Sequence, residues 1–214
     1  MFQSVGFEKV VSYNYVNDAG AFDFASLITT LEEAPIPSIF VFHACAHNPS
    51  GSDPSPAQWK QVAEIMKRRN LFPLFDAAYL GLASGNFDED AYPIRHFSHN
   101  AGTEVGVCLS FAKIMGLYGE RVGALAFTAR SSEDVGVIES HLEQLQRAEI
   151  SNPPAFGARI VSTVLQDGLL RVMWENSLFA MRQRLSTMRQ RLYDELQAHG
   201  KIARMSPVSS YELC

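Results

Sequence analysis

The stretch that decides the fold is L-S-F-A-K-I-M-G-L-Y-G-E-R-V-G, residues 109–123. Apolar residues lead into it and the run 123–127 leads out of it, a pattern that predicts a strand, an irregular loop and a second strand. The loop carries one lysine, Lys113, with Ser110 three residues before it and Arg121 eight residues after it. Such an amine can form a Schiff base with a carbonyl, while the hydroxyl and guanidinium groups hold an anion nearby. A solvent-exposed surface lysine is the alternative interpretation.

The composition excludes several classes of protein. The chain has 214 residues, 47% of them hydrophobic, which is enough to bury a substantial core. Its net charge of −5 argues against a nucleic-acid partner, and its one basic cluster, 67–69, falls where a predicted helix ends. Three cysteines without short spacing predict no disulfide framework and favour a reducing compartment. With no apolar run of transmembrane length and no signal-peptide pattern, we expect no membrane partner.

Strands and helices alternate through the first half of the chain. We expect a strand over 8–15, a helix over 23–33 capped by Asp23, a strand over 38–44, a helix that begins at Ser55, and a strand over 71–75. The continuous apolar run over 38–44 is typical of a strand covered on both faces in a parallel sheet.

Helices dominate the second half. We expect a helix over 88–100 interrupted by Pro93, one from Ser131 or Ser132 to Arg147, and one over 155–165. The stretch 169–199 reads as one long amphipathic helix with an arginine-rich exposed side. A helix of this length suits a connector between two lobes.

Polar side chains follow the two central strands. Asn48 comes after the strand over 38–44, and Asp76 ends the strand over 71–75, so a βαβ unit puts both at the carboxyl edge of a sheet. After four apolar residues, Asp76 is expected to be partly buried and to need a partner. It can pair with a protonated heterocyclic nitrogen, and Tyr79 can hydrogen-bond the same ligand.

Other readings of these residues remain open. Asp76 could instead cap a helix or a turn. His43, Cys45 and His47 alternate along an extended segment and could bind a metal, although no second ligand cluster accompanies them.

Six motifs occur in order along the chain: H-A-C-A-H-N-P-S-G (43–51), W-K-Q-V-A-E-I-M-K-R-R (59–69), F-D-A-A-Y-L-G-L-A-S-G (75–85), S-F-A-K (110–113), G-L-Y-G-E-R-V-G (116–123) and S-N-P-P (151–154). Together they resemble class I pyridoxal-phosphate-dependent aminotransferases, specifically aspartate aminotransferases. The resemblance covers about residues 5–197. It implies a fold type I, α/β homodimer that moves an amino group between aspartate or glutamate and their 2-oxo acids.

The resemblance also implies roles around the cofactor, pyridoxal 5'-phosphate. Lys113 resembles the catalytic lysine that forms the Schiff base with the cofactor and later shuttles the proton. Asp76 resembles the aspartate that keeps the pyridine nitrogen protonated. Asn48 and Tyr79 resemble the pair that hydrogen-bonds the ring hydroxylate, and Asn48 also lies at the substrate.

Three further residues resemble anion-binding groups of this family. Ser110 and Arg121 resemble ligands of the cofactor phosphate. Arg147 resembles the arginine that reaches into the neighbouring subunit's site and pairs with the distal carboxylate of the substrate. Near the cofactor the chain departs from the family's usual residues at five positions: Ala77, Leu80, Ala112, Ile114 and Met115.

Family chains are about twice as long, so the resemblance implies a large-domain fragment with a mainly parallel sheet. We expect residues 1–165 to form part of the cofactor-binding domain, 166–200 a long interdomain helix, and 201–214 a divergent tail. Two hypotheses follow: an aspartate-type aminotransferase, or a non-catalytic relative that acts only as a dimerisation partner. We expect a cytoplasmic location, with the mitochondrion as the alternative.

Overall fold

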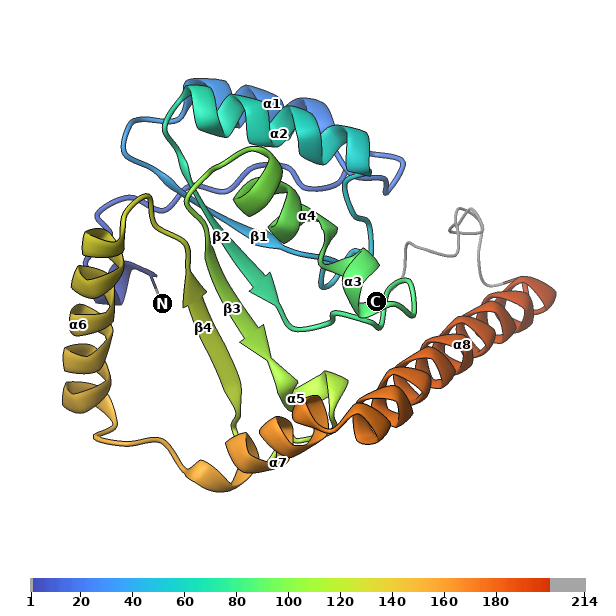
Figure 1. The fold of residues 1–214 in the computed structure, drawn as a ribbon. Helices are drawn as coiled ribbons and strands as arrows, with labels where there is room; N and C mark the ends of the chain where they lie inside the picture. The colour runs from blue at the N-terminus through green and yellow to red at the C-terminus, as the bar shows by residue number, and fades with distance from the viewer. Residues whose placement is uncertain (1, 201–214) are drawn as a thin grey trace.

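The computed structural model describes residues 2–200, and these form an α/β fold (Figure 1). The short N-terminal helix is η1 (Phe2–Val5). The other elements are α1 (Phe24–Glu33), β1 (Ile39–His43), α2 (Pro56–Arg68), β2 (Phe72–Ala77), α3 (Phe87–Asp90), α4 (Tyr92–Arg95), the π-helical turn η2 (His96–Asn100), β3 (Gly106–Ser110), α5 (Phe111–Ile114), β4 (Gly123–Phe127), α6 (Ser132–Glu149), α7 (Ala155–Gln166) and α8 (Gly168–Ala198).

The four strands form one mixed sheet in the order β1-β2-β3-β4. The first three strands are parallel, and β4 runs antiparallel to β3. His43 is paired with Asp76, and Asp76 with Cys108, so these residues lie side by side across the sheet near its carboxyl edge. The prediction that the ends of β1 and β2 meet at one edge is therefore confirmed.

Helix starts follow the local sequence. Asp23 accepts a hydrogen bond from the Ser26 N–H and caps α1, as predicted. Ser55 caps α2 in a complete capping box with Gln58, also as predicted. Ser131 caps α6. Each cap satisfies backbone N–H groups that the first turn of a helix leaves unpaired.

The main core lies between one face of the sheet and helices α1, α2 and α4, which stack above it in Figure 1. Phe42, Phe75, Trp59 and Phe97 form a group of aromatic rings at its centre, with centroids 5.2–6.1 Å apart. A second, smaller cluster joins α5 to α7 and α8 through four buried side chains: Phe111, Ile114, Val161 and Leu178.

Two predictions about the sheet are wrong. The stretch 8–15 is not a strand, because no described strand lies beside it; only an isolated bridge joins Val16 to Phe22. β1 is covered on one face rather than both. Ile39 and Val41, on its other face, are 46% and 42% exposed, because the helices that contact the sheet lie on the opposite side. An apolar strand sequence shows that burial is favourable, but not which segment provides it.

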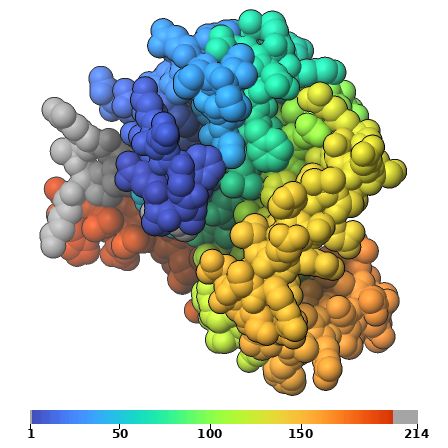
Figure 2. All heavy atoms as spheres, turned by 90° about the vertical axis from the view of Figure 1, so that its left-hand side faces the viewer, coloured from blue at the N-terminus to red at the C-terminus, as the bar shows by residue number. Residues whose placement is uncertain are grey.

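The later helices contribute little to this core. α6 buries no side chain and lies on the outside of the molecule, beyond β4 (Figures 1 and 2). α8 is the predicted long helix, with 31 residues, yet only Leu178 is buried on it. Among the described residues, no helix is long and apolar enough to cross a membrane. The predicted tail, 201–214, lies outside the described residues.

Candidate active site

Three predicted residues come together at the carboxyl edge of the sheet. Asn48 lies in the loop after β1, Tyr79 in the loop after β2, and Lys113 on α5, directly after β3. The Asn48 Nδ2 donates a hydrogen bond of 3.5 Å to the Tyr79 Oη. The Lys113 Nζ lies 4.9 Å from the centroid of the Tyr79 ring, within the range of a cation–π contact. The cluster therefore places an amine beside two groups that can bind an oxygen anion.

Lys113 lies on a single turn of helix rather than in the predicted irregular loop. Ser110 caps this turn, and its hydroxyl accepts from the Ala112 N–H at 3.3 Å. Ile114 is fully buried, and its carbonyl accepts from the Trp174 indole N–H of α8 at 2.7 Å. The turn forms because its cap and its buried apolar residue fix both ends, and this fixes the place from which the lysine extends.

Asp76 is exposed, contrary to the prediction of partial burial. The strand alternates faces, and Asp76 falls on the face of the sheet that carries no helix. No residue of the described chain makes a hydrogen bond or ion pair with its carboxylate. Burial, and then the charge of Asp76, raise the pKa of the adjacent Cys108 thiol. The carboxylate is therefore available to a ligand at the edge of the sheet.

The loop that carries Asn48 is held by stacked rings and hydrogen bonds. The Asn48 N–H donates to the His43 Nδ1 at 3.0 Å, and the His47 ring stacks on Tyr15 with centroids 3.5 Å apart. Burial, and then the nearby His43, lower the pKa of His47 to about 4. The His47 Nδ1 contacts the Ser50 hydroxyl at 2.8 Å. These contacts hold both histidine rings and so support the loop that carries Asn48.

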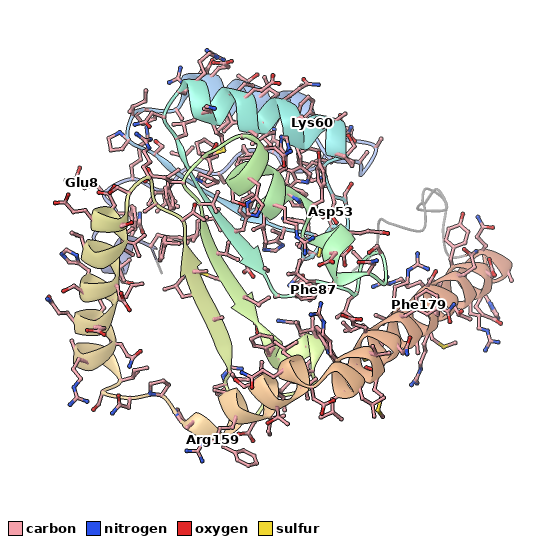
Figure 3. All side chains as sticks on the ribbon, viewed as in Figure 1. Glu8, Asp53, Lys60, Phe87, Arg159 and Phe179 are labelled. Atoms are coloured by element: carbon pink, nitrogen blue, oxygen red, sulfur yellow. The ribbon has the colours of Figure 1, made fainter. Side chains whose placement is uncertain are left out.

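Two half-buried tyrosines, Tyr13 and Tyr15, and a half-buried acid, Asp53, lie close to the same loop. Desolvation by burial raises the pKa of Tyr13 to about 12. Burial raises the pKa of Tyr15 further, with the charge of Asp53 as the second cause. Burial also raises the pKa of Asp53, although backbone N–H groups of His47 and Ala46 oppose this rise. Figure 3 labels Asp53 close to α3, the helix that carries Asp90, whose charge also contributes to the raised pKa.

The two predicted arginines are not part of this cluster in a single chain. Arg121 is exposed, and its Nη1 donates to the Tyr118 carbonyl at 3.3 Å. Arg147 lies near the end of α6, where it donates to the Ser151 hydroxyl at 3.2 Å. α6 stands on the far side of β4 from α5 (Figure 1), so Arg147 does not reach Lys113 within the chain.

Two acids that hold loops of the site, Asp53 and Asp90, were not predicted from the sequence. Asp90 is 6% exposed and accepts hydrogen bonds from three backbone N–H groups of the loop after Tyr79. Asp90 is the last residue of an acidic run, D-E-D (88–90), and such a run is typical of the solvent-exposed start of a helix. Asp53 follows the N-P-S-G turn, and a carboxylate just beyond a turn is a signal for a loop anchor.

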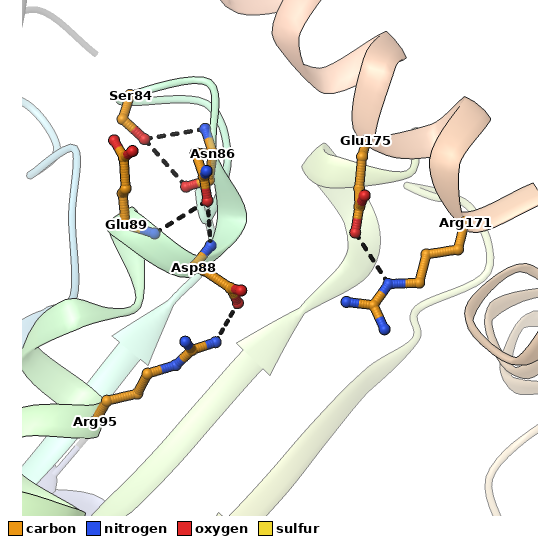
Figure 4. Close-up of polar contacts among 7 residues, drawn as sticks. All are labelled: Ser84, Asn86, Asp88, Glu89, Arg95, Arg171 and Glu175. Atoms are coloured by element: carbon orange, nitrogen blue, oxygen red, sulfur yellow. Dashed lines mark hydrogen bonds and ion pairs between the residues drawn. The ribbon is translucent and has the colours of Figure 1, made fainter. Parts of the chain in front are cut away.

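The polar contacts that α3, α4 and α8 make near the surface are exposed. Figure 4 shows Asn86, which caps α3 by accepting from the N–H groups of Asp88 and Glu89. It also shows the ion pair between Arg95 and Asp88, and the pair between Arg171 and Glu175. Exposed pairs of this kind contribute little to stability. We therefore regard the cluster around Lys113, rather than these surface pairs, as the candidate reactive centre.

The arrangement suits an amine that acts on a carbonyl-bearing ligand. Lys113 makes no ion pair with any described residue, so its amine is available to react. Asn48 and Tyr79 can donate hydrogen bonds to an oxygen anion, and Asp76 can accept a hydrogen bond from a cationic nitrogen. In apo structures such contacts are often long and tighten when the ligand binds.

Comparison with known proteins identifies the family of the chain. Residues 1–211 match the family described as aminotransferase class I and II, whose members use pyridoxal phosphate. The chain is 43% identical over 201 residues to the cytoplasmic aspartate aminotransferase of Gallus gallus, covering 94% of this chain and 48% of that protein. The chain therefore spans about half the length of this curated relative.

Solved structures give the same result. The broad specificity aminotransferase from Leishmania mexicana superposes with a TM-score of 0.93 at 38% identity, covering 99% of this chain and 52% of that one. The aromatic-amino-acid aminotransferase from Burkholderia pseudomallei, described as covalently bound to pyridoxal phosphate, gives a TM-score of 0.88 at 39% identity, with coverages of 93% and 49%. The family match over residues 1–211 and the similarity to these structures show that the chain belongs to the class I and II aminotransferase family.

Proposed function

We propose that this chain carries the cofactor half of an aspartate aminotransferase, which converts L-aspartate and 2-oxoglutarate to oxaloacetate and L-glutamate. The observation that carries the proposal is the cluster of Asn48, Tyr79 and Lys113 at the carboxyl edge of the sheet. Ligands of open α/β folds bind at this edge. The 43% identity to a cytoplasmic aspartate aminotransferase supports the choice of substrates.

The described residues fit pyridoxal 5'-phosphate. The cofactor, when bound, would supply an electron sink for the pair left when the substrate α-proton departs. Lys113 holds the cofactor through its amine and moves the proton at the substrate Cα. Asp76 accepts a hydrogen bond from the ring nitrogen, and its exposed, unpaired carboxylate supports this role. Asn48 and Tyr79 bind the ring hydroxylate.

Ser110 and Arg121 flank the lysine and are proposed to hold the phosphate. The Ser110 hydroxyl accepts one hydrogen bond from the backbone and keeps its own proton to donate. Arg121 makes no ion pair with any described residue, which leaves its guanidinium group for an external anion. A hydroxyl and a guanidinium group form charge-assisted hydrogen bonds to phosphate.

We also propose a homodimer in which Arg147 serves the neighbouring site. Arg147 is exposed on α6 and does not approach Lys113 within its own chain. Its place outside the cluster supports a role toward a second subunit, where it would pair with the distal carboxylate of the substrate. In the same scheme, residues 1–165 form part of the cofactor-binding domain and 166–200 the interdomain helix. The cytoplasm is the proposed location, with the mitochondrion as the alternative.

A second candidate function is that of a non-catalytic dimerisation partner. The observation that favours it is the apolar surface at β4 and α6, where Leu125, Val135 and Leu145 are 50%, 48% and 60% exposed. Light scattering on the purified chain, alone and mixed with a full-length relative, tests it. A chain that stays monomeric alone and forms no complex with the relative contradicts this role.

Absorbance spectra of the chain mixed with pyridoxal phosphate test the main proposal. We expect a visible band of the bound cofactor that L-aspartate bleaches and 2-oxoglutarate restores. Lys113→Ala should abolish the band, whereas Lys60→Ala should leave it unchanged, because Lys60 is exposed on α2, away from the site (Figure 3). A band that persists in Lys113→Ala contradicts the proposal.

A further inference from the structure

Two acids lie behind the loops that carry Asn48 and Tyr79. Asp53 belongs to the end of the first loop, and Asp90 to α3, which follows the second. They are close enough that the charge of Asp90 contributes to the raised pKa of Asp53. Neither side chain is among those proposed above to touch the cofactor or the substrate.

Asp90 fixes the loop after Tyr79 through backbone groups. Its Oδ2 accepts from the Gly81 N–H at 2.7 Å and the Ala83 N–H at 3.0 Å, and its Oδ1 accepts from the Ser84 N–H at 3.0 Å. The Tyr79 carbonyl closes the turn by accepting from the Leu82 N–H at 2.9 Å. A carboxylate that accepts three N–H groups in a buried site is a strong local constraint.

Asp53 does the same for the loop that carries Asn48. Its two oxygens accept from the N–H groups of Ala46 and His47, the latter at 2.9 Å. Ala46 has a φ of 53°, in the left-handed region that non-glycine residues avoid. The hydrogen bond from Ala46 to the carboxylate therefore offsets a strained backbone, and it sets the direction in which the chain leaves toward Asn48.

The two anchored loops meet at the Asn48–Tyr79 contact. Neither Asn48 nor Tyr79 is fully buried, so packing alone does not fix this pair. We propose that Asp53 and Asp90 are positioning residues, each holding by backbone hydrogen bonds one of the loops that present Asn48 and Tyr79 beside Lys113. The positions of Asn48 and Tyr79 can be tested without the cofactor. That these two residues bind a cofactor rests on the proposed function.

The substitutions Asp53→Asn and Asp90→Asn test this role with little change in size. An asparagine replaces one acceptor oxygen with an NH₂ group that faces backbone donors, so hydrogen bonds to the loop are lost. The matched control is Asp88→Asn, also on α3, because Asp88 is exposed and pairs with Arg95 at the surface. Circular dichroism checks that each variant is folded.

The first measurement uses the cofactor-free protein. In NMR spectra, the Asn48 side-chain amide should show a cross-peak to the Tyr79 ring in the wild type and in Asp88→Asn. We expect the cross-peak to weaken at least about two-fold in Asp53→Asn and in Asp90→Asn. Amide exchange at Gly81 should accelerate about ten-fold or more in Asp90→Asn, as expected for the loss of a charge-assisted hydrogen bond. If Asp90→Asn does not fold, Asp53→Asn decides the same question on the other loop.

The second measurement uses pyridoxal phosphate. The pH at which the bound cofactor changes colour should shift in Asp90→Asn in the same direction as in Tyr79→Phe. Adding Asp90→Asn to Tyr79→Phe should shift it no further, because the acid acts through the tyrosine. A folded Asp90→Asn or Asp53→Asn variant that keeps the wild-type cross-peak overturns the proposal. If the cross-peak is lost as expected but the wild type itself does not bind the cofactor, the positioning role stands and the proposed function fails.

Discussion

Replacing Leu178 by alanine tests how the long helix α8 is held to the site. Leu178 is 1% exposed and is the one buried side chain on the helix. It packs with Phe111, Ile114 and Val161 in the smaller core cluster. Because Phe111 and Ile114 frame the turn that carries Lys113, this side chain ties the helix to the candidate active site.

The size of the effect follows from this burial. The substitution removes three buried carbon atoms, worth about 0.8 kcal/mol each on transfer from water, or about 2.4 kcal/mol together. The cavity left behind adds to this, so we expect a loss of about 3 kcal/mol in the free energy of unfolding. For a chain of this length, that lowers the melting temperature by about 6–12 °C.

Urea unfolding measures this loss. It should be followed by far-ultraviolet circular dichroism and by tryptophan fluorescence, to which Trp59 and Trp174 both contribute. The Trp174 indole N–H donates to the Ile114 carbonyl. The control is Leu192→Ala on the same helix, since Leu192 is 61% exposed and its truncation should cost less than about 0.5 kcal/mol. A loss below about 1 kcal/mol in Leu178→Ala, or equal losses in both variants, refutes the reasoning.

Three further predictions concern the loops and a helix cap. The pKa of His47 is lowered from 6.5 to about 4, so the unfolded chain binds a proton within this window that the folded chain does not, and stability falls as the pH is lowered through it. Because His47 is partly exposed, the loss in the free energy of unfolding should be about 1–2 kcal/mol in urea titrations. His47→Phe should remove this pH dependence, whereas His141→Phe should leave it unchanged. Equal pH slopes in both variants contradict this prediction. Ser55→Ala breaks the capping box of α2 and should cost about 1 kcal/mol in thermal unfolding, so an unchanged midpoint contradicts that role. Gly81→Ala should cost at least about 1 kcal/mol, because φ is 87° and the new Cβ would lie 2.8 Å from Leu178; a neutral result would show that the loop relaxes.

Local rules predicted the helices and the edge of the sheet well. The caps at Asp23, Ser55 and Ser131 lie where the sequence placed them, because a cap depends on residues within one turn. The meeting of His43 and Asp76 follows from parallel pairing, which the βαβ pattern requires.

Predictions that depend on distant segments were less successful. The stretch 8–15 has strand-forming residues but no described neighbour to pair with, and burial of Asp76 depends on what covers that face of the sheet. The position of Asp53 just beyond a turn indicates a loop anchor, but the sequence does not show which backbone N–H groups Asp53 and Asp90 accept, because the folded loops decide that.

Site residues were predicted by type and order, and the structure brings only some of them together. Asn48, Tyr79 and Lys113 cluster because they follow three adjacent parallel strands. Arg147 lies apart on α6, and no local pattern could show whether it acts within its own chain or toward a neighbour.

The most direct test of the central claim is to find which residue the cofactor attaches to. The chain is mixed with pyridoxal phosphate, reduced with borohydride to fix any bond to an amine, digested, and analysed by mass spectrometry. The account predicts one pyridoxyl group per chain, on the peptide that contains Lys113. Labelling spread over Lys60, Lys67 and Lys113 alike, or no label at Lys113, would contradict it.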